Sequence, residues 1–572
     1  MLYAAHIATL TLALHNPDAL FRQNNVFVVP LGTRKHSLGS VEFLRKDSRI
    51  PRRLPEDEEG EAPLRYGLKK RSEEELALRP NSFDLVIMNP PFARSCGDNL
   101  LFGSIQDSRL RQSMKTRMTE LLEGCNLGGI GQAGLGAVFV AVADKYVKTR
   151  GRIAFVLPRN LLSGVSWQKI RELLVRRMSN AHWIKGGYHL EFVILSAEPQ
   201  AYNFSENTDL SETLFVARKL DTDDSAAKTL AVILHRKPRT VFESLALSKP
   251  IASLSQQIQK ADVFDIASNP NAWPHQLSLG NEIVGRAYSL NSDLIEDNVD
   301  NWGRLFAFAY PELTKIVARL RTLKEFNVPG GLSLHIPLKR LTSLVSVGPD
   351  RRQIHDSFDQ ADSGLVRGLW GKDMSMDLLE IEPNTYLTPK SGASPDKLIV
   401  SAGHLMIAER IRLNTTPLVA LYSREEALSN VWWPAKVDSS VRQKSADAAK
   451  ILSLWLNSTP GLLLIMAELE VTEGPWTAMK KTTLEQVPVI DLSALQPRQV
   501  TGLLELYTTM SRWRAPLLKQ QFEEARHGKG WRFSLDTGLL GVLRARGIEL
   551  QELRPLYELL FQEATLWEHH PR

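Results

Sequence analysis

The chain has little cysteine: its 572 residues include only Cys96 and Cys125. Two thiols are too few for a disulfide framework or a thiolate zinc site, so the composition favours a reducing cytoplasm. No uninterrupted apolar run approaches the roughly 18 residues of a membrane-spanning helix. The apolar segment Met1–Leu14 is interrupted by polar residues and lacks the basic start of a signal peptide. We therefore expect a cytoplasmic protein that does not enter a membrane.

Several catalytic signatures are also missing. The sequence contains no G-x-x-x-x-G-K-[ST] motif, which excludes a P-loop nucleotide-binding site at the level of motifs. His189 with Glu191 and His404 with Glu409 lack the spacing and the further ligands that a metal site requires. No carboxylate cluster typical of a nuclease is apparent. We expect no bound metal.

The composition is that of a large folded protein. With 43% hydrophobic residues and 12 tryptophans in 64.2 kDa, the chain is long enough for several hydrophobic cores. A net charge of +6 and a pI near 9.1 modestly favour a polyanionic partner. The densest charge lies in Arg45–Arg71, which reads as a solvated insertion, and a phosphate contact there stays open as an alternative.

The most informative segment is a strand followed by two prolines. Ser82–Met88 is an apolar run without helical periodicity, which is typical of a buried parallel strand. The tetrapeptide Asn89-Pro90-Pro91-Phe92 follows it directly. Because open α/β sheets bind ligands at the carboxyl ends of their strands, the tetrapeptide is a candidate site.

These four residue types suit the chemistry of an exocyclic amine on a nucleobase. The lone pair of such an amine is delocalised into the ring, and acceptors directed at its two hydrogens help it to become nucleophilic. The side-chain oxygen of Asn89 and the carbonyl oxygen of Pro90 are two such acceptors, and the prolines hold the backbone that directs them. The ring of Phe92 can stack on an extruded base. The alternative interpretation is that the tetrapeptide is a chance turn after a strand, without a role in catalysis.

The tetrapeptide resembles the motif of the N6-adenine DNA methyltransferases, which is Asn or Asp, Pro, Pro, and then an aromatic residue. The flanks fit this resemblance. Residues 136–148 have helical periodicity, Arg152–Pro158 reads as the next buried strand, and a second helix is expected at about Trp167–Met178. This run is similar to the segment after the catalytic motif in methylase subunits of Type I and Type IIG restriction-modification systems. The resemblance implies a Rossmann-like methyltransferase sheet.

The family also places a second aromatic residue opposite the first one. The resemblance implies Phe204 for that role, in the loop that leads into Leu214–Arg218. Packing in the core is the alternative role for Phe204.

The family's methyl donor is S-adenosylmethionine, which it binds with a Gly-rich turn after the first strand and an acid after the second. Neither feature precedes Asn89. Gly129–Gly134 matches the G-x-G-x-x-G spacing, but residues 125–128 read as a loop rather than a strand, so a loop near the catalytic strand is the better interpretation. The cofactor-binding residues are therefore unknown.

By resemblance, Met1–Leu14 and Asn24–Pro30 correspond to the second helix and third strand of the methylase fold. The first two strands would then be absent, which would leave two unpaired edges in the sheet. A complementing N-terminal polypeptide, a remnant enzyme and a misassigned start codon are the three explanations that stay open.

The expected organisation has four parts. They are a partial methyltransferase domain at 1–235, a helical spacer at 236–331 that includes a long helix at Arg304–Leu323, a target-recognition-like α+β domain at 332–492, and a C-terminal helical region at 493–572. In the third part, Lys397–Ser401 and Leu418–Tyr422 read as strands. Trp476, Lys480 and Lys481 form a candidate DNA-facing loop, although packing is an equal reading for the tryptophan.

The sequence thus predicts an α/β protein with an incomplete Rossmann-like methyltransferase sheet, an α+β target-recognition domain and C-terminal helices. The leading hypothesis is the catalytic and recognition part of a site-specific DNA adenine-N6 methyltransferase of a restriction-modification or phage-defence system. It would flip its base out of double-stranded DNA and act with S-adenosylmethionine. A complementing N-terminal polypeptide or a restriction subunit would be its protein partner. The alternative is a non-catalytic DNA-binding remnant or scaffold subunit.

Overall fold

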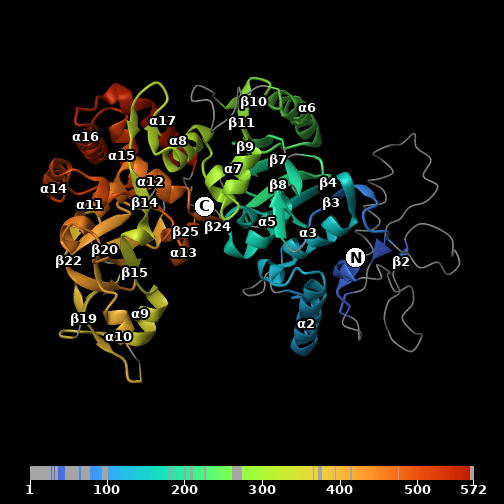
Figure 1. Cartoon of the computed structure of the whole chain (residues 1–572), viewed down its shortest axis with the longest axis horizontal. Helices are drawn as coiled ribbons and strands as arrows, with labels where there is room; N and C mark the ends of the chain where they lie inside the picture. Colours follow the sequence, from blue (N-terminus) through green and yellow to red (C-terminus); the bar gives the residue numbers. More distant parts are fainter. Residues whose placement is uncertain are drawn as a thin grey trace. The chain divides into compact units, whose positions relative to one another are not determined.

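The computed structural model (Figure 1) describes residues 27–28, 31–32, 37–45, 64–65, 78–92, 101–179, 182–185, 187–198, 201–205, 210–224, 227–260, 274–364, 366–371, 376–392, 395–411, 415–473 and 476–566. The chain divides into two compact units, each taken by itself below. The first comprises residues 1–161, 165–191 and 214–226, and the second comprises 162–164, 192–213 and 227–572. The expected four-part organisation stays a prediction.

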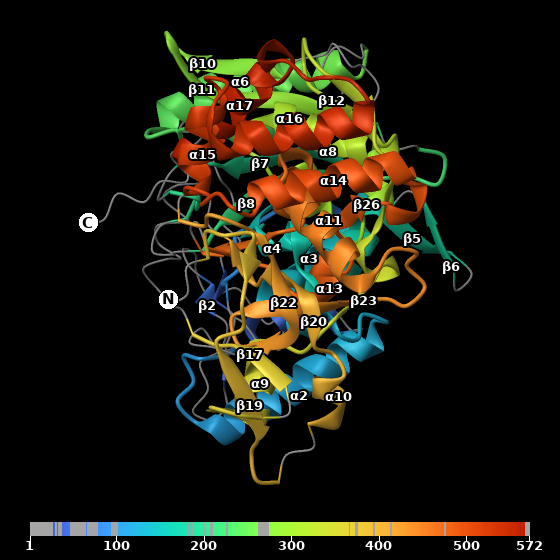
Figure 2. The same ribbon diagram turned by 90° about the vertical axis from the view of Figure 1, so that its left-hand side faces the viewer.

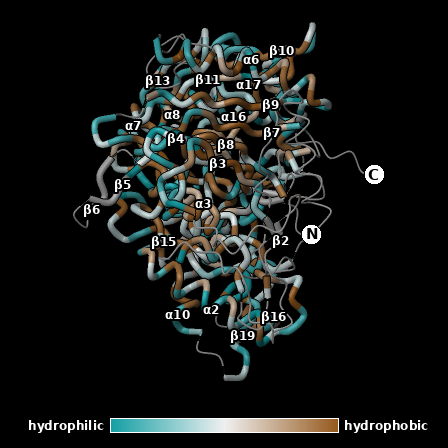
Figure 3. The backbone as a smooth tube through the Cα atoms, turned by 90° about the vertical axis from the view of Figure 1, so that its right-hand side faces the viewer, coloured by the Kyte–Doolittle hydropathy of each residue, from teal (hydrophilic) through white to brown (hydrophobic). Residues whose placement is uncertain are grey.

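A seven-stranded sheet has the order β10-β11-β9-β7-β8-β4-β3. In that order, the strands are His275–Leu279, Glu282–Leu290, Thr229–Leu234, Tyr188–Ser196, Glu212–Lys219, Val147–Pro158 and Phe83–Met88. The pairs β3–β4 and β7–β9 are parallel, whereas β9, β11 and β10 pair antiparallel. Figure 3 shows hydrophobic colouring along β7 and β9, as expected for strands buried on both faces. The mixed α/β class agrees with the sequence expectation.

The helices of the first unit are α2 (Ser108–Gly124), α3 (Leu135–Tyr146) and α5 (Gln168–Val175), with the single turn α4 at Asn160–Ser163. The carboxylate of Asp107 caps α2 by accepting hydrogen bonds from the N–H groups of Arg109 and Leu110, at 2.8 and 3.3 Å. At Gly136 in α3, a Cβ atom would lie 3.0 Å from Leu157 of β4. The glycine thus lets α3 approach the sheet closely.

The first unit also contains two short antiparallel pairs and a 3₁₀ turn near its N-terminal end. They are β1 (Phe27–Val28) with β2 (Leu64–Arg65), β5 (Arg176–Ser179) with β6 (His182–Lys185), and η1 (Gly39–Leu44). The expected strand at Asn24–Pro30 is confirmed at Phe27–Val28, whereas Met1–Leu14 and most of the Arg45–Arg71 insertion lie outside the described residues.

The expected elements around the tetrapeptide are present, with three corrections. The strand Phe83–Met88 is parallel as expected, but it is not buried, because it ends the sheet order and has one neighbour among the described strands. Strand β4 begins at Val147, directly after α3, so Arg150-Gly151 lies inside the strand and does not separate it from the helix. Helix α5 ends at Val175, because the chain turns into the β5–β6 hairpin where the helix was expected to continue to Met178.

In the second unit, an eight-stranded sheet follows the path β15-β23-β20-β22-β17-β19-β16, and β18 also pairs with β22. Along that path the strands are Val345–Val347, Trp432–Val437, Gly403–Ala408, Ala420–Ser429, Val366–Leu369, Thr385–Pro389 and Phe358–Ala361, with β18 at Glu380–Ile381. Smaller pairings join β12 (Glu325–Asn327) to β13 (Ser333–His335), and β14 (Leu338–Arg340) to β26 (Pro488–Ile490). A three-stranded sheet contains β21 (Arg410–Ile411), β25 (Trp476–Ala478) and β24 (Glu470–Glu473).

Helices cover these sheets within the second unit, and Figure 2 shows α14 and α16 lying side by side. The longer helices are α6 (Val241–Ile258), α8 (Pro311–Thr322), α11 (Ser445–Asn457), α14 (Pro497–Met510), α16 (Gly530–Arg544) and α17 (Leu550–Leu566). The shorter ones are α7 (Ser292–Asp297), α9 (Arg351–Ser357), α10 (Asp396–Ile399), α12 (Thr459–Met466), α13 (Lys481–Leu484) and α15 (Leu518–Ala525). One continuous hydrophobic core joins buried residues from Phe308 to Ala564.

Two expectations for the second unit were wrong. The long helix expected at Arg304–Leu323 begins at Pro311. Proline lacks the N–H of an interior helical residue and suits the first turn, so residues 302–305 form a separate 3₁₀ turn. Lys397–Ser401 is not a strand, since Asp396–Ile399 forms α10. The expected strand at Leu418–Tyr422 is confirmed from Ala420 onward.

Among the described residues, no single helix is long and apolar enough to cross a membrane. The consecutive helices α11 and α12 pass that test only together, by length and composition, and they are bent by 73° at their junction. Both belong to the hydrophobic core of the second unit.

Candidate active site

The tetrapeptide Asn89-Pro90-Pro91-Phe92 follows the carboxyl end of β3. In the parallel register, Leu85 is the partner of Arg152 and Met88 is the partner of Phe155. The two prolines end the strand because they have no N–H to donate to a ladder. Asn89 and Pro91 are exposed, Pro90 is buried and Phe92 is half-buried. The tetrapeptide is therefore open to solvent through Asn89, while Pro90 anchors the turn against the protein.

The adjacent strand ends in polar residues that the sequence analysis missed. Strand β4 continues three residues beyond Phe155, to Pro158, and is followed by Arg159 and Asn160. Arg159 is buried, and the buried Oδ1 atom of Asn160 has no hydrogen-bond partner. The signal in the sequence was a polar pair after a buried strand, which is the same signal that identified Asn89. These residues follow the same end of the β3–β4 pair as the tetrapeptide.

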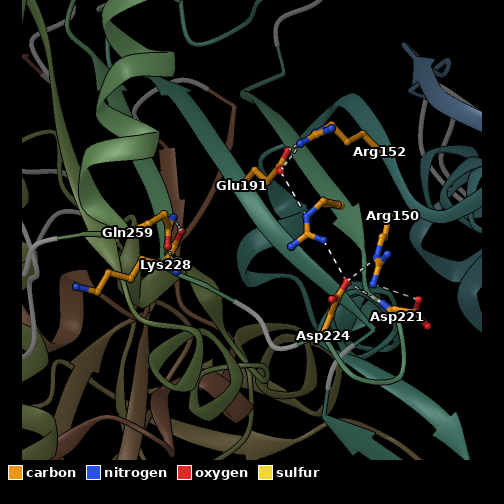
Figure 4. Close-up of polar contacts among 8 residues, drawn as sticks. Arg150, Arg152, Glu191, Asp221, Asp224, Lys228 and Gln259 are labelled. Carbon is orange, nitrogen blue, oxygen red and sulfur yellow. Dashed lines mark hydrogen bonds and ion pairs between the residues drawn. The ribbon is translucent and has the colours of Figure 1, made fainter.

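The opposite end of these strands carries a network of charges, shown in Figure 4. Arg152 donates hydrogen bonds of 2.7 and 2.9 Å to the carboxylate of Glu191, and this interaction raises the pKa of Arg152. Arg218 lies 3.8 Å from Glu191 and 3.3 Å from Asp224. Arg150 lies 3.5 Å from Asp224. Because each arginine faces a carboxylate, this end of the sheet is a neutralised structural network and not a site for an anion.

The start of β3 has an ion pair of its own. Lys148 contacts the carboxylate of Asp84, and the hydrogen bond from Lys148 is the main reason that the pKa of Asp84 is lowered. Both side chains are largely exposed, so the pair adds little stability.

Phe204 belongs to the second unit and is half-buried. It packs against a core cluster formed by β9, β10, β11 and α6. Its backbone N–H and that of Ser205 donate to Oε2 of the buried Glu212, which holds the start of the loop. This contact agrees with the packing role that the sequence left open, and the role opposite Phe92 stays a prediction.

The candidate DNA-facing residues lie in the second unit. Trp476 is in β25, and its side chain is outside the described part of the structure. Lys480 and Lys481 are exposed at the start of α13. The register of β21 and β25 pairs Arg410 with Ala478, so the exposed Arg410 is a further cation beside this loop. Sequence reasoning missed Arg410, because nothing in the chain marks that β21 and β25 are neighbours.

The described residues do not fit a donor site of the expected kind. Gly129–Gly134 follows helix α2 and the turn residues 125–128, as expected, and not a strand. Residues 130–133 form a 3₁₀ turn, and a Cβ at Gly131 would lie 3.3 Å from Met118 of α2. Lys169 donates to the carbonyl of Gly128 at 2.5 Å, so the segment is packed between helices. Among the described strands, none is followed by the G-x-G-x-x-G spacing and a helix.

The histidine and acidic side chains of the described residues form no further candidate centre. Within the described residues, no group of three or more His, Cys, Asp or Glu side chains could hold a metal ion. His404 contacts the carbonyl of Ser423 at 2.9 Å and stacks on Tyr422, with 5.5 Å between the ring centroids. Packing therefore accounts for this histidine.

Comparisons with known proteins gave likenesses to solved structures alone. No family model matches the chain, and no curated protein matches it. One similar structure is the type IIG restriction endonuclease BpuSI, with 13% identity, a TM-score of 0.29, and coverage of 85% of this chain and 55% of that one. The methyltransferase subunit of a type I restriction-modification system from Streptococcus thermophilus is 16% identical, with a TM-score of 0.24, and coverage of 39% of this chain and 37% of that one. The M protein of the type I restriction enzyme EcoKI is 14% identical, with a TM-score of 0.20, and coverage of 36% and 40%.

These similar structures are proteins of restriction-modification systems, among them two methylase subunits. The chain spans 55% of the length of BpuSI, 37% of the Streptococcus thermophilus subunit and 40% of the EcoKI M protein. At these identities and TM-scores the likenesses do not assign the chain to a family.

Proposed function

We propose that the chain is the base-holding and DNA-recognition part of a site-specific DNA adenine-N6 methyltransferase. The observation that carries the proposal is the Asn89–Phe92 tetrapeptide at the carboxyl end of β3, a strand parallel to β4. That end of a parallel sheet is where α/β proteins bind their ligands. The exposure of Asn89 and the anchoring of Pro90 agree with a turn that meets a ligand.

In the proposed reaction, the target adenine leaves the duplex before it is methylated. The side-chain oxygen of Asn89 and the carbonyl oxygen of Pro90 accept hydrogen bonds from the two hydrogens of the N6 amine. They orient its lone pair for attack and stabilise the positive charge that develops on nitrogen. The ring of Phe92 stacks on the base. Phe204 is proposed as the second stacking residue.

S-Adenosylmethionine is the methyl donor implied by the motif. Because the described residues do not fit a donor site, we derive no step through it from this chain. The proposed assembly acts on double-stranded DNA in the cytoplasm, in a restriction-modification or phage-defence system. Trp476, Lys480 and Lys481 are proposed as DNA contacts of the recognition part.

The test replaces Asn89 by alanine in the methylating assembly. Removing one of two acceptors should lower the methylation rate by at least about 100-fold, as for a single oxyanion-hole donor, while duplex affinity changes less than twofold. Asn89→Asp keeps an acceptor and should retain part of the activity. Gln106→Ala, an exposed amide in the same unit, is the matched control. Full activity of Asn89→Ala would sink the proposal, and an assembly that binds DNA but never methylates would support a scaffold or remnant.

A further inference from the structure

The segment Asn203–Ser205 follows the end of one of two parallel strands in the second unit. Ser196 of β7 is the register partner of Leu234 of β9, and both strands end at these residues or directly after them. Open α/β sheets bind ligands at the carboxyl ends of parallel strands, and loops fixed on such a sheet carry the contact residues. The aromatic residue of this segment is Phe204, which is half-buried. Its place in the fold is that of a contact residue.

Two charged side chains hold this segment. Oε2 of Glu212, at the start of β8, accepts hydrogen bonds from the N–H groups of Phe204 at 2.5 Å and Ser205 at 2.7 Å. Nζ of Lys237, after β9, donates to the carbonyl oxygen of Asn203 at 2.5 Å. That carbonyl and the N–H of Phe204 belong to one planar peptide group, so the two charges fix the plane from its two sides. The N–H of Ser205 fixes the next peptide group as well.

These two side chains are themselves anchored to the ends of the strands. The backbone N–H of Lys237 donates to Oε2 of Glu198, which follows β7, at 2.7 Å. The backbone N–H of Glu212 donates to the carbonyl of Tyr202 at 2.9 Å. Hydrogen bonds to charged groups are stronger than those between neutral groups. The backbone on both sides of Phe204 is therefore set by the sheet before any ligand arrives.

Holding the loop with Glu212 has a cost in stability. The side chain is 0% exposed, and its Oε1 atom has no hydrogen-bond partner among the described residues. In the same part of the chain, the buried Oγ atom of Ser211 and Oγ1 atom of Thr213 have no partner either. Unsatisfied buried polar atoms destabilise a fold, and proteins tolerate them where function requires it.

Glu563 makes the same kind of contact without this cost. It is also 0% exposed in the second unit, and it accepts hydrogen bonds from two consecutive N–H groups, those of Ala309 at 3.0 Å and Tyr310 at 3.1 Å. Here each carboxylate oxygen accepts one of the two bonds. Glu212 instead uses one oxygen for both. The difference indicates that Glu212 serves the position of the loop more than the stability of the core.

We propose that Glu212 and Lys237 are positioning residues, which fix the ring of Phe204 for stacking on a planar ligand. This role rests on the proposed function, in which the ligand is the extruded adenine. Neither charged side chain touches the base, because each acts through the peptide groups beside Phe204. A ring whose backbone is fixed in advance loses less conformational freedom when a base stacks on it. The two residues thus favour the stacked state of the base without adding to the affinity for the duplex.

The first experiment tests the contact in the full chain without DNA. Hydrogen exchange at the amides of Phe204 and Ser205 should be slow in the unaltered protein and about tenfold faster in Glu212→Ala, which loses the acceptor. Glu212→Gln keeps an acceptor oxygen and should keep both amides slow. Glu563→Ala is the matched control and should not change exchange at these two amides. Equal exchange in the unaltered protein and in Glu212→Ala would overturn the proposal.

The second experiment measures kcat and the KM for duplex DNA in the methylating assembly. Phe204→Ala should lower kcat by about 5- to 150-fold, as expected for a lost stacking contact. Glu212→Ala and Lys237→Met should each lower kcat by at least about threefold and change the KM by less than about twofold. Glu212→Gln should restore most of kcat. If Glu212→Ala does not fold, the half-buried Lys237 carries the same test.

The decisive comparison is a double-mutant cycle. In the Phe204→Ala background, neither Glu212→Ala nor Lys237→Met should lower kcat further, because both act through that ring. A purely structural role would give additive losses. Additive losses, or an equal loss of kcat from Glu563→Ala, would overturn the proposal.

The outcomes separate this proposal from the proposed function. Full activity of Asn89→Ala would refute the proposed function. Full activity of Phe204→Ala beside an inactive Asn89→Ala would refute the positioning role and leave the methyltransferase assignment standing. Loss of activity in Asn89→Ala, together with losses from Glu212→Ala that depend on Phe204, would support both.

Discussion

Met88 is the register partner of Phe155, so β3 ends three residues before β4 ends at Pro158. Because of this stagger, the Asn89–Phe92 tetrapeptide begins beside the last three residues of β4 and not beyond the end of that strand. The exposed amide of Asn89, the buried Arg159 and the half-buried Asn160 thus come from the same end of two adjacent parallel strands. Convergence of polar groups at that end is what an α/β ligand site requires.

Phe92 should contribute by stacking on the extruded base. Replacing it with alanine should lower the rate of adenine methylation by about 5- to 150-fold, which corresponds to about 1–3 kcal/mol per stacked base. Phe92→Tyr keeps the ring and should stay within about threefold of the unaltered protein. The fluorescence of 2-aminopurine at the target position should rise less with Phe92→Ala. Equal rates for the alanine and tyrosine variants would contradict stacking.

The cations beside β25 should contact phosphates. Replacing Arg410, Lys480 and Lys481 together by alanine should weaken duplex binding at all sequences, because phosphate contacts carry no sequence information. The slope of log K against log salt should shrink by about 0.9 for each lost contact. Lys249→Ala, an exposed lysine on α6, is the control and should leave the slope unchanged. A triple variant with the original slope would show that these residues do not meet the backbone of DNA.

Glu468 should contribute strongly to the stability of the second unit. It is 1% exposed, and its carboxylate accepts hydrogen bonds from Asn301 at 3.0 Å, Arg304 at 2.7 Å and Arg321 at 2.5 Å. Glu468→Ala leaves two guanidinium groups without this partner in the interior, so the free energy of unfolding should fall by about 3–5 kcal/mol. Urea unfolding measures this change. Glu505→Ala on the exposed side of α14 should change it by less than about 0.5 kcal/mol.

His235 should make stability depend on pH. Burial lowers its pKa, and Arg286 lowers it further, while the contact with the carbonyl of Ala309 at 3.0 Å raises it. Because the folded state binds its proton less readily than the unfolded state, stability is full above the ordinary histidine pKa of about 6.5 and is lost as the pH falls through that value. His235→Gln should flatten the fall in unfolding free energy between about pH 7.5 and 5.5. His335→Gln, at an exposed position, should not.

The sequence predicted much of the fold near the candidate site. The apolar run before Asn89, the helical period of α3 and the strand at Arg152–Pro158 were each recognisable from local patterns, and the structure confirms them. Local patterns could not show that β3 lies at a sheet edge, because an apolar strand reads as buried whether or not a neighbour covers it. The role of the tetrapeptide itself stays a prediction.

The other differences between the predictions and the structure have physical causes that act beyond the local sequence. The periodicity of Arg304–Leu323 is helical throughout, yet Pro311 selects the start of α8. Lys397–Ser401 has strand propensity, and its tertiary context favours a single helical turn. Arg410 could not be linked to Lys480, because their proximity depends on a register between segments about 70 residues apart.

The continuous core from Phe308 to Ala564 has a practical consequence for anyone who subclones this protein. A recombinant fragment that ends near residue 492 would lack α14, α16 and α17. The apolar residues that pack against these helices would then be exposed to solvent, and we expect the fragment to precipitate. Boundaries chosen before Asn301 and after α17 would keep that core in one fragment, together with the three hydrogen-bond partners of Glu468.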